Sequence, residues 1–226
     1  IGRLVGSEMC IRDRLKTGIN NIAKISREFG LGLPTGLNLP GEKGGLIPDR
    51  DWKLREKQKV WRPGETIIAG IGQGYVLVTP MQLALMTARI ANGGKKIIPT
   101  LIKYDGKISN NFLNTVISKD NLNIIKKAME SVTLDEFGTG RTFRLGKKGV
   151  EMAGKTGTVQ VRRISTTERE SKEGVIKNED RIWEWRDHAL YVGYAPMEKP
   201  KYAISVIVEH GGSGSSKAGP IARDIM

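Results

Sequence analysis

The sequence has one cysteine, two histidines and no long hydrophobic run. Cys10 on its own excludes an intrachain disulfide. His188 and His210 lie far apart in the sequence, and no His, Cys and acidic residues cluster at metal-ligand spacing, so neither a metal nor another cofactor is indicated. No segment approaches the roughly 18 apolar residues that span a bilayer, and none has the charged-then-apolar order of a signal peptide.

Acidic residues are also scarce, with 24 Asp and Glu against 37 Lys and Arg, which gives a formal net charge of +13. This charge invites a nucleic-acid hypothesis. The basic residues are scattered, however, and no helix-turn-helix, zinc-finger or aromatic-platform pattern accompanies them, so we predict no nucleic-acid partner. Anionic lipid or an anionic polymer fits the charge equally well. The 226 residues, 38% of them hydrophobic, suffice for one large domain or most of one.

The stretch from Gly149 to Thr158 fits two incompatible chemistries. Gly149-x-x-x-x-Gly154-Lys155-Thr156 matches the P-loop pattern, which cradles phosphates. Read from Lys155, the same letters contain the Lys-Thr-Gly triad of penicillin-binding proteins and serine β-lactamases. A P-loop needs a strand before its glycines and a helix after its Lys-Thr. Residues 143–149 are broken by glycines and charged, and residues 157–161 predict a strand, so a P-loop NTPase remains only as the alternative.

Apolar spacing and turn residues predict a mixture of helices and strands. A helix carrying Ile22, Ile25 and Phe29 ends at the glycines that follow it. The best helix start is Thr79-Pro80-Met81-Gln82, where the threonine is an N-cap and the glutamine completes a capping box. The other predicted elements are a turn-rich excursion over 34–63, helices over 119–130 and after Gly219-Pro220, strands over 155–161, 189–194 and 202–209, and a solvated charged loop or lid over 162–186. Helices followed by a run of strands indicate an α+β fold with an antiparallel sheet.

The first fourteen residues differ in character from the rest. The string from Val5 to Arg14 resembles a translated sequencing-adapter read, and it has no clear amphipathic period. We therefore expect Ile1–Arg14 to be a non-native leader. Cys10, which lies within it, would then not be native either.

Six short motifs occur in a fixed order along the chain. They are Gly36-Leu37-Asn38-Leu39-Pro40-Gly41-Glu42, Ile71-Gly72-Gln73-Gly74-Tyr75, Thr79-Pro80-Met81-Gln82-Leu83-Ala84, Ala153-Gly154-Lys155-Thr156-Gly157-Thr158-Val159-Gln160, Asp187-His188-Ala189 and Ala218-Gly219-Pro220-Ile221-Ala222. Each is weak alone, but together they resemble the penicillin-binding protein 2 family, the class B peptidoglycan D,D-transpeptidases of cell elongation. The resemblance covers Leu15–Met226 and implies a penicillin-binding-protein or serine-β-lactamase-like fold, an antiparallel sheet flanked by helices.

The resemblance implies acyl transfer through a covalent serine ester, in which a Ser-x-x-Lys serine attacks the carbonyl between the last two D-alanines of a stem peptide. Lys155, Thr156 and Gly157 would form the opposite catalytic wall, with Lys155 supplying positive charge. The Thr156 and Thr158 hydroxyls would bind the terminal carboxylate of the substrate or of a β-lactam. The Thr158 backbone N–H would be an oxyanion-hole donor, and Gly157 would let the substrate lie along the strand.

The sequence departs from the family because it contains no Ser-x-x-Lys. Ser109-Asn110-Asn111 formally matches Ser-x-Asn but follows the capped helix, whereas the resemblance places that motif before residue 15. We therefore expect residues 15–226 to be the C-terminal part of a transpeptidase domain, inactive alone, with the nucleophile and a membrane anchor upstream. The resemblance places the parent in the bacterial inner membrane, with this domain in the periplasm beside a membrane glycosyltransferase, acting in cell-shape maintenance.

For the remaining conspicuous side chains, the main alternative to a role at the active site is packing alone. Gln73 and Tyr75 either shape a loop near the active serine or only pack. His188 is expected to end a strand with a local hydrogen bond, and Trp183 and Trp185 either cover the cleft or pack.

Overall fold

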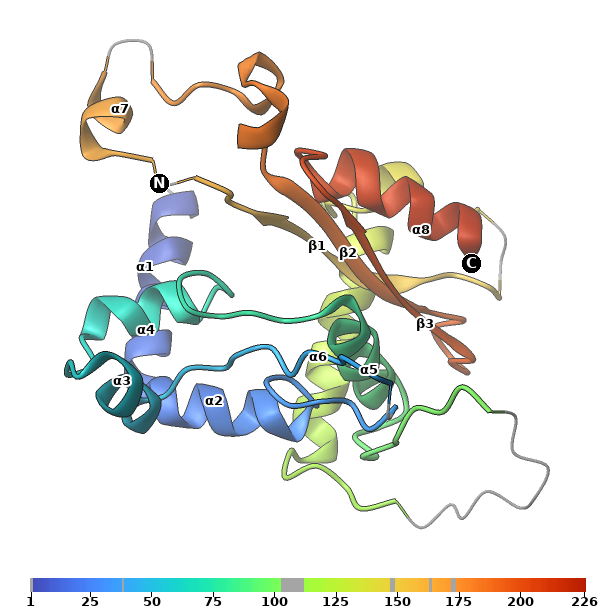
Figure 1. Cartoon of the computed structure of the whole chain (residues 1–226). Coiled ribbons are helices and arrows are strands. Elements are labelled where there is room, and N and C mark those ends of the chain that lie inside the picture. Colours follow the sequence, from blue (N-terminus) through green and yellow to red (C-terminus); the bar gives the residue numbers. More distant parts are fainter. Residues whose placement is uncertain (1, 38, 103–111, 147–148, 163, 172–173) are drawn as a thin grey trace. The chain divides into compact units, whose positions relative to one another are not determined.

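A computed structural model describes the chain except for residues 1, 38, 103–111, 147–148, 163 and 172–173 (Figure 1). Asn38 and the Ser109-Asn110-Asn111 match therefore lie outside the described residues. The chain divides into two compact units, which are described separately. The first comprises Ile1–Met86 and Lys95–Val116, and the second comprises Thr87–Gly94 and Ile117–Met226.

The first unit begins with two consecutive helices, α1 (Gly2–Thr17) and α2 (Ile19–Glu28). Gly18 separates them at a positive φ of 75°, a conformation that favours glycine. The predicted helix through residues 22–29 is confirmed, and Ile19 and Ala23 are its buried positions. Helix α1 covers the segment expected to be a leader, and the Arg14 guanidinium donates to the Ile67 carbonyl oxygen at 3.0 Å.

The turn-rich excursion predicted over 34–63 is partly wrong, because it contains α3 (Arg50–Lys57) and is followed directly by α4 (Pro63–Ala69). Asp49 caps α3 by accepting from the Trp52 N–H at 2.8 Å. Pro63 occupies the first turn of α4, where its missing N–H costs nothing. Both residues also favour turns, and that is why the sequence pattern misled.

The capped helix is confirmed as α5 (Pro80–Ala91). The Gln82 N–H donates to Thr79 Oγ1 at 3.2 Å, and Gln82 Oε1 accepts from the Thr79 N–H at 3.1 Å. The fully buried Gln82 amide also donates to the carbonyl oxygens of Leu33 and Gly44, both at 2.7 Å. One side chain thus caps the helix and fixes the two ends of the loop over 33–44.

The second unit contains a three-stranded antiparallel sheet of order β1 (Ala153–Val159), β2 (His188–Ala195) and β3 (Tyr202–Val208). This confirms the α+β prediction and all three strands. Its helices are α6 (Lys119–Leu134), α7 (Thr166–Glu170) and α8 (Gly219–Ile225), with a π-helical turn over Gly214–Ala218 and 3-10 turns over Arg141–Phe143, Asn178–Asp180 and Trp183–Trp185. Helix α8 packs on β2 and β3, and α6 packs on β1 (Figure 1).

The core of this unit lies between the sheet and α8. Its buried members are Phe143, Met152, Ala189, Tyr191, Ala195, Ala218 and Ala222. The rings of Phe143 and Tyr191 meet edge to face, with centroids 5.2 Å apart. On the opposite side, Thr133 of α6 donates its hydroxyl to the Met152 carbonyl oxygen at 2.6 Å. The start of β1 is therefore held from both faces.

The charged segment over 162–186 is not only a solvated loop, because it contains α7 and a buried anchor. Arg181 is 8% exposed and donates to the Ile176 carbonyl oxygen at 2.9 Å, to Asn178 Oδ1 at 3.0 Å and to Asp187 Oδ1 at 3.2 Å. The Asn178 amide completes the pairing of Asp187. A buried carboxylate held in this way fixes where the segment joins β2.

Candidate active site

The Lys-Thr-Gly residues lie on β1, at the edge of the sheet. Lys155 pairs with Val192, Thr156 with Tyr191, and Thr158 with Ala189. Lys155 and Thr158 are exposed, whereas Thr156 is half-buried. A strand rather than a helix therefore follows Lys155-Thr156, and the P-loop alternative finds no support.

The glycines of this motif differ in whether the surrounding structure leaves room for a side chain. A Cβ on Gly154 would overlap the Tyr191 hydroxyl oxygen and the Val192 carbonyl oxygen, because the Tyr191 ring lies across that part of the strand. A Cβ on Gly157 would meet only Leu190 Cβ, at 3.3 Å. Gly214 of the π-helical turn lies against the Gly157 backbone and has no room for a Cβ. The packing thus requires Gly154, whereas Gly157 leaves open surface.

A pocket of about 480 Å³ opens beside Lys155. Its other lining residues come from the last turns of α6 and the loop after it, and they are Ala128, Ser131, Val132, Asp135, Glu136, Phe137, Gly138 and Thr139. The Lys155 ammonium donates to the Thr156 carbonyl oxygen at 2.8 Å. Phe137 is 94% exposed at the rim. The pocket therefore combines one lysine, two carboxylic acids, hydroxyl groups and an uncovered aromatic ring.

Thr139 is a residue of the candidate site that the sequence did not indicate. Its hydroxyl oxygen lies 2.9 Å from Thr156 Oγ1. The two residues are 17 apart in sequence, and the only local signal is that Thr139 stands between Gly138 and Gly140. A residue between two glycines predicts a tight turn but not what the turn approaches.

The two histidines, far apart in sequence, meet at the start of β2. The His210 backbone N–H donates to His188 Nδ1 at 2.9 Å. His188 lies at a strand end, as predicted, but its hydrogen-bond partner is 22 residues away, so the predicted local bond is not what the structure shows. The two imidazole rings are 4.7 Å apart, and the Trp183 ring lies 4.4 Å from His210. Trp183 therefore packs on a histidine, although it stays 56% exposed.

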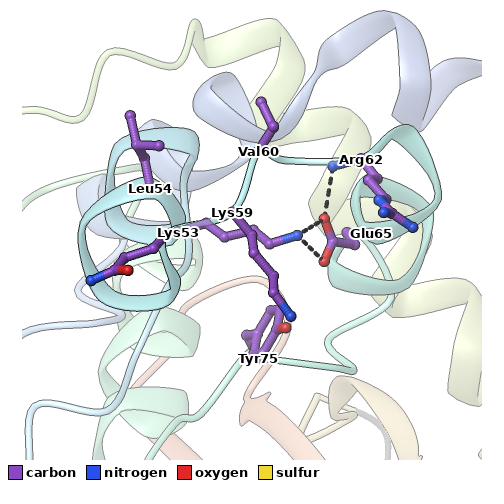
Figure 2. A pocket seen from close by; sticks show the side chains of 8 residues that line it. Lys53, Leu54, Lys59, Val60, Arg62, Glu65 and Tyr75 are labelled. Atoms are coloured by element: carbon purple, nitrogen blue, oxygen red, sulfur yellow. Dashed lines mark hydrogen bonds and ion pairs between the residues drawn. The ribbon is translucent and has the colours of Figure 1, made fainter.

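Tyr75 lines a second pocket, of about 560 Å³, within the first unit (Figure 2). Figure 2 shows the Lys53 ammonium directed at the Glu65 carboxylate, which also accepts from the Arg62 backbone N–H at 2.7 Å. Burial opposes ionisation of Glu65, but these hydrogen bonds prevail and hold its pKa below the usual value. Gln73 lines a neighbouring hollow of about 230 Å³. The ion pair and the backbone N–H thus satisfy the Glu65 carboxylate within this pocket.

Comparison with known proteins identifies the class. The chain belongs to the penicillin-binding protein transpeptidase domain family, whose model matches residues 10–226. It is similar to the peptidoglycan D,D-transpeptidases MrdA of Haemophilus influenzae, with 35% identity over 92% of this chain and 32% of that protein, and of Acinetobacter baumannii, with 37% identity over 90% and 30%. The predicted resemblance to the penicillin-binding protein 2 family is confirmed.

Solved structures agree with this assignment. Pseudomonas aeruginosa PBP2 in complex with WCK 5153 superposes with a TM-score of 0.79 at 36% identity, covering 97% of this chain and 44% of that one. The complex between PBP2 and MreC from Helicobacter pylori gives 0.78 at 33% identity, covering 97% and 37%. The chain thus spans about a third of the length of the curated relatives that it matches. Within the described part of the chain, no helix has the length and apolarity to cross a membrane.

Proposed function

We propose that this chain forms the Lys-Thr-Gly wall of a serine-type peptidoglycan D,D-transpeptidase that acts in cell-shape maintenance. The observation that carries the proposal is the placement of Lys155, Thr156 and Thr158 on an exposed edge strand beside an open pocket. No Ser-x-x-Lys occurs in the 226 residues, so the acylated serine belongs to another segment of the complete protein. Residues 15–226 would be the C-terminal part of the domain, and residues 1–14 a non-native leader.

The hydrogen bonds of β1 support a role for its outer edge. The Thr156 carbonyl oxygen accepts from the Lys155 ammonium, as expected for a carbonyl that points away from β2. In an antiparallel strand the N–H and C=O groups of residues i and i+2 point to the same side. The Thr158 N–H is then directed to the open edge, where it would donate to the oxyanion of an acyl-transfer intermediate. Loss of one such donor costs about 100- to 1000-fold in rate in other enzymes.

Lys155 would stabilise negative charge in the pocket, and the Thr156 and Thr158 hydroxyls would bind the carboxylate of a stem peptide or a β-lactam. Gly157, without a side chain, would let the peptide lie along the strand as an added strand. We further propose that the complete protein is anchored in the inner membrane, with this domain in the periplasm. Its partners there would be a membrane glycosyltransferase and MreC, the protein that is bound to PBP2 in the H. pylori complex.

The test is covalent labelling of the complete gene product with a fluorescent penicillin. Lys155→Ala is expected to slow labelling by about 100-fold, because charge stabilisation is lost at the reacting centre. The matched control is Lys201→Ala, which removes an exposed lysine of the same unit outside the pocket and should label like the unmodified protein. Equal labelling of the Lys155→Ala protein and the control would overturn the proposal.

A further inference from the structure

The Thr139 hydroxyl forms a hydrogen bond with the Thr156 hydroxyl, with the two oxygens 2.9 Å apart. We propose that Thr139 is a positioning residue, which donates its proton to Thr156 Oγ1 and so leaves the Thr156 proton free for the substrate carboxylate. The inference rests on the proposed function and names a residue that the Lys-Thr-Gly motif does not contain.

The turn that carries Thr139 is rigidly built. The Gly140 N–H donates to the Val132 carbonyl oxygen at 2.7 Å, and the Gly138 N–H donates to the Asp135 carbonyl oxygen at 3.0 Å. A Cβ on Gly138 would overlap the carbonyl oxygens of the last turn of α6, so the turn lies directly on the end of the helix. Thr139 is therefore held between two fixed glycines.

The path of the turn brings it to the edge of β1. Thr156 pairs with Tyr191, whose ring lies in the core, so the neighbouring Lys155 side chain points to the opposite face of the sheet. Helix α6 lines a pocket with Lys155 on that face. Three residues after Gly140, Phe143 packs against Tyr191 in the core on the other face. The loop between them must pass the edge of β1, and Thr139 is at that crossing, 2.9 Å from Thr156.

The direction of the hydrogen bond follows from the number of protons that the two hydroxyls carry. A hydroxyl has one proton to donate and two lone pairs that accept. If Thr156 donated to Thr139, it would present only lone pairs to an incoming carboxylate, and the two would repel. If Thr139 donates, the Thr156 proton is free, and the two hydroxyls form a chain whose bonds polarise each other. The Lys155 ammonium, bonded to the Thr156 carbonyl oxygen, adds positive charge at the same place.

The experiment uses the complete gene product and separates binding from chemistry. The concentration of penicillin that gives half-maximal acylation is measured together with the first-order acylation rate. Thr139→Val keeps the shape and removes the hydroxyl; it is expected to raise that concentration about fivefold while the rate changes less than about twofold. Thr139→Ser restores the hydroxyl and should behave like the unmodified protein. Thermal melting of each variant reports any loss of folding.

A double-mutant cycle with Thr156→Val completes the test. Thr139→Val should add nothing on the Thr156→Val background, because Thr139 acts only through Thr156. The inference would be overturned if Thr139→Val left the penicillin concentration for half-maximal acylation unchanged while Thr156→Val raised it. The proposed function would still stand in that case. Effects of Thr139→Val that persist in the double variant, or that Thr139→Ser shares, would also overturn it. If neither Lys155→Ala nor Thr156→Val affects acylation, the proposed function itself fails.

Discussion

At the scale of single residues, the two glycines that flank Lys155 and Thr156 should differ in their tolerance of a side chain. Gly154→Ala is expected to lower the free energy of unfolding by about 3 kcal/mol or more, because its Cβ would overlap the Tyr191 hydroxyl and the Val192 backbone, which cannot move aside. The matched control is Gly157→Ala, whose Cβ meets only Leu190 Cβ at 3.3 Å and should cost less than about 1 kcal/mol. Urea unfolding of the two variants measures the difference. Equal losses would mean that the Tyr191 ring does not constrain Gly154.

Tyr194 gives a prediction for alkaline pH. Burial raises the pKa of Tyr194 to about 12, with a further contribution from Glu130, and its hydroxyl has no partner in the described part of the chain. An unfolded tyrosine ionises near pH 10. Between about pH 10 and 12 only the unfolded state loses this proton, so stability should fall by at most about 1.4 kcal/mol per pH unit for this group. Below pH 10 the contribution is fully present.

Tyr194→Phe should make the free energy of unfolding fall less steeply between about pH 10 and 12, because the ionising hydroxyl is absent. At neutral pH the stability should be equal or higher, because an unpaired buried hydroxyl is removed. Part of the slope should remain, since burial also raises the pKa of Tyr191. The control is Tyr202→Phe, which changes a tyrosine that is 65% exposed and should leave the slope unchanged. Denaturant unfolding at several pH values measures both. The same slope in Tyr194→Phe and the unmodified chain would contradict the assignment.

The motif residues were predictable one by one, but their neighbours were not. Lys155 to Thr158 could be placed on a strand because alternation and β-branching are local signals. Thr139 could not be assigned, because its contact with Thr156 depends on how a loop passes a strand edge. His188 and His210 likewise meet only because β2 and β3 pair in register, with Ala189 opposite Val208.

At the scale of elements, α5 shows how one buried side chain organises a loop. Gln82→Glu is expected to lower the free energy of unfolding by about 3–5 kcal/mol, because a carboxylate cannot donate to the Leu33 and Gly44 carbonyl oxygens and would be buried as a charge. Thr79→Ala removes only the cap and should cost about 1 kcal/mol. Gln160→Glu, at an exposed position, is the control and should change stability by less than about 0.5 kcal/mol. Denaturant unfolding measures the free energy of unfolding of the three variants. If Gln82→Glu loses no more than Thr79→Ala, the hydrogen bonds of the Gln82 amide are not needed for stability.

Whether an element could be predicted depended on how ambiguous its boundary residues are. The start of α5 has a threonine, a proline and a glutamine that all favour the same N-terminus, and it was found. Helix α3 was missed because its cap, Asp49, belongs to a Pro-Asp pair that equally predicts a turn. The charged segment over 162–186 was expected to be solvated because its composition is polar, yet Arg181 is buried by its ion pair with Asp187, a tertiary contact that composition does not reveal.

At the scale of the whole molecule, the fold and the family agree with the predictions from sequence, and the proposed function assigns one wall of a catalytic site to this chain. Lys155, Thr156 and Thr158 offer charge and hydrogen bonds, whereas covalent capture of a penicillin needs a serine with an adjacent base. Ser131 lines the pocket with Lys155, but leucine rather than lysine stands three residues after it, one helical turn away. On the proposed function, the described residues would provide a binding surface but no activated nucleophile.

The 226-residue chain, purified and incubated with a fluorescent penicillin, is accordingly expected to show no labelled band on a denaturing gel. The complete gene product, treated in the same way, should label and provides the positive control. Heat-denatured chain reports non-specific reaction with exposed lysines, which must be subtracted. A serine-linked adduct on the native chain, located by peptide mass mapping, would contradict this account. Because Ser131 is the serine that lines the pocket beside Lys155, loss of such an adduct in Ser131→Ala would then identify a nucleophile that no Ser-x-x-Lys motif announces.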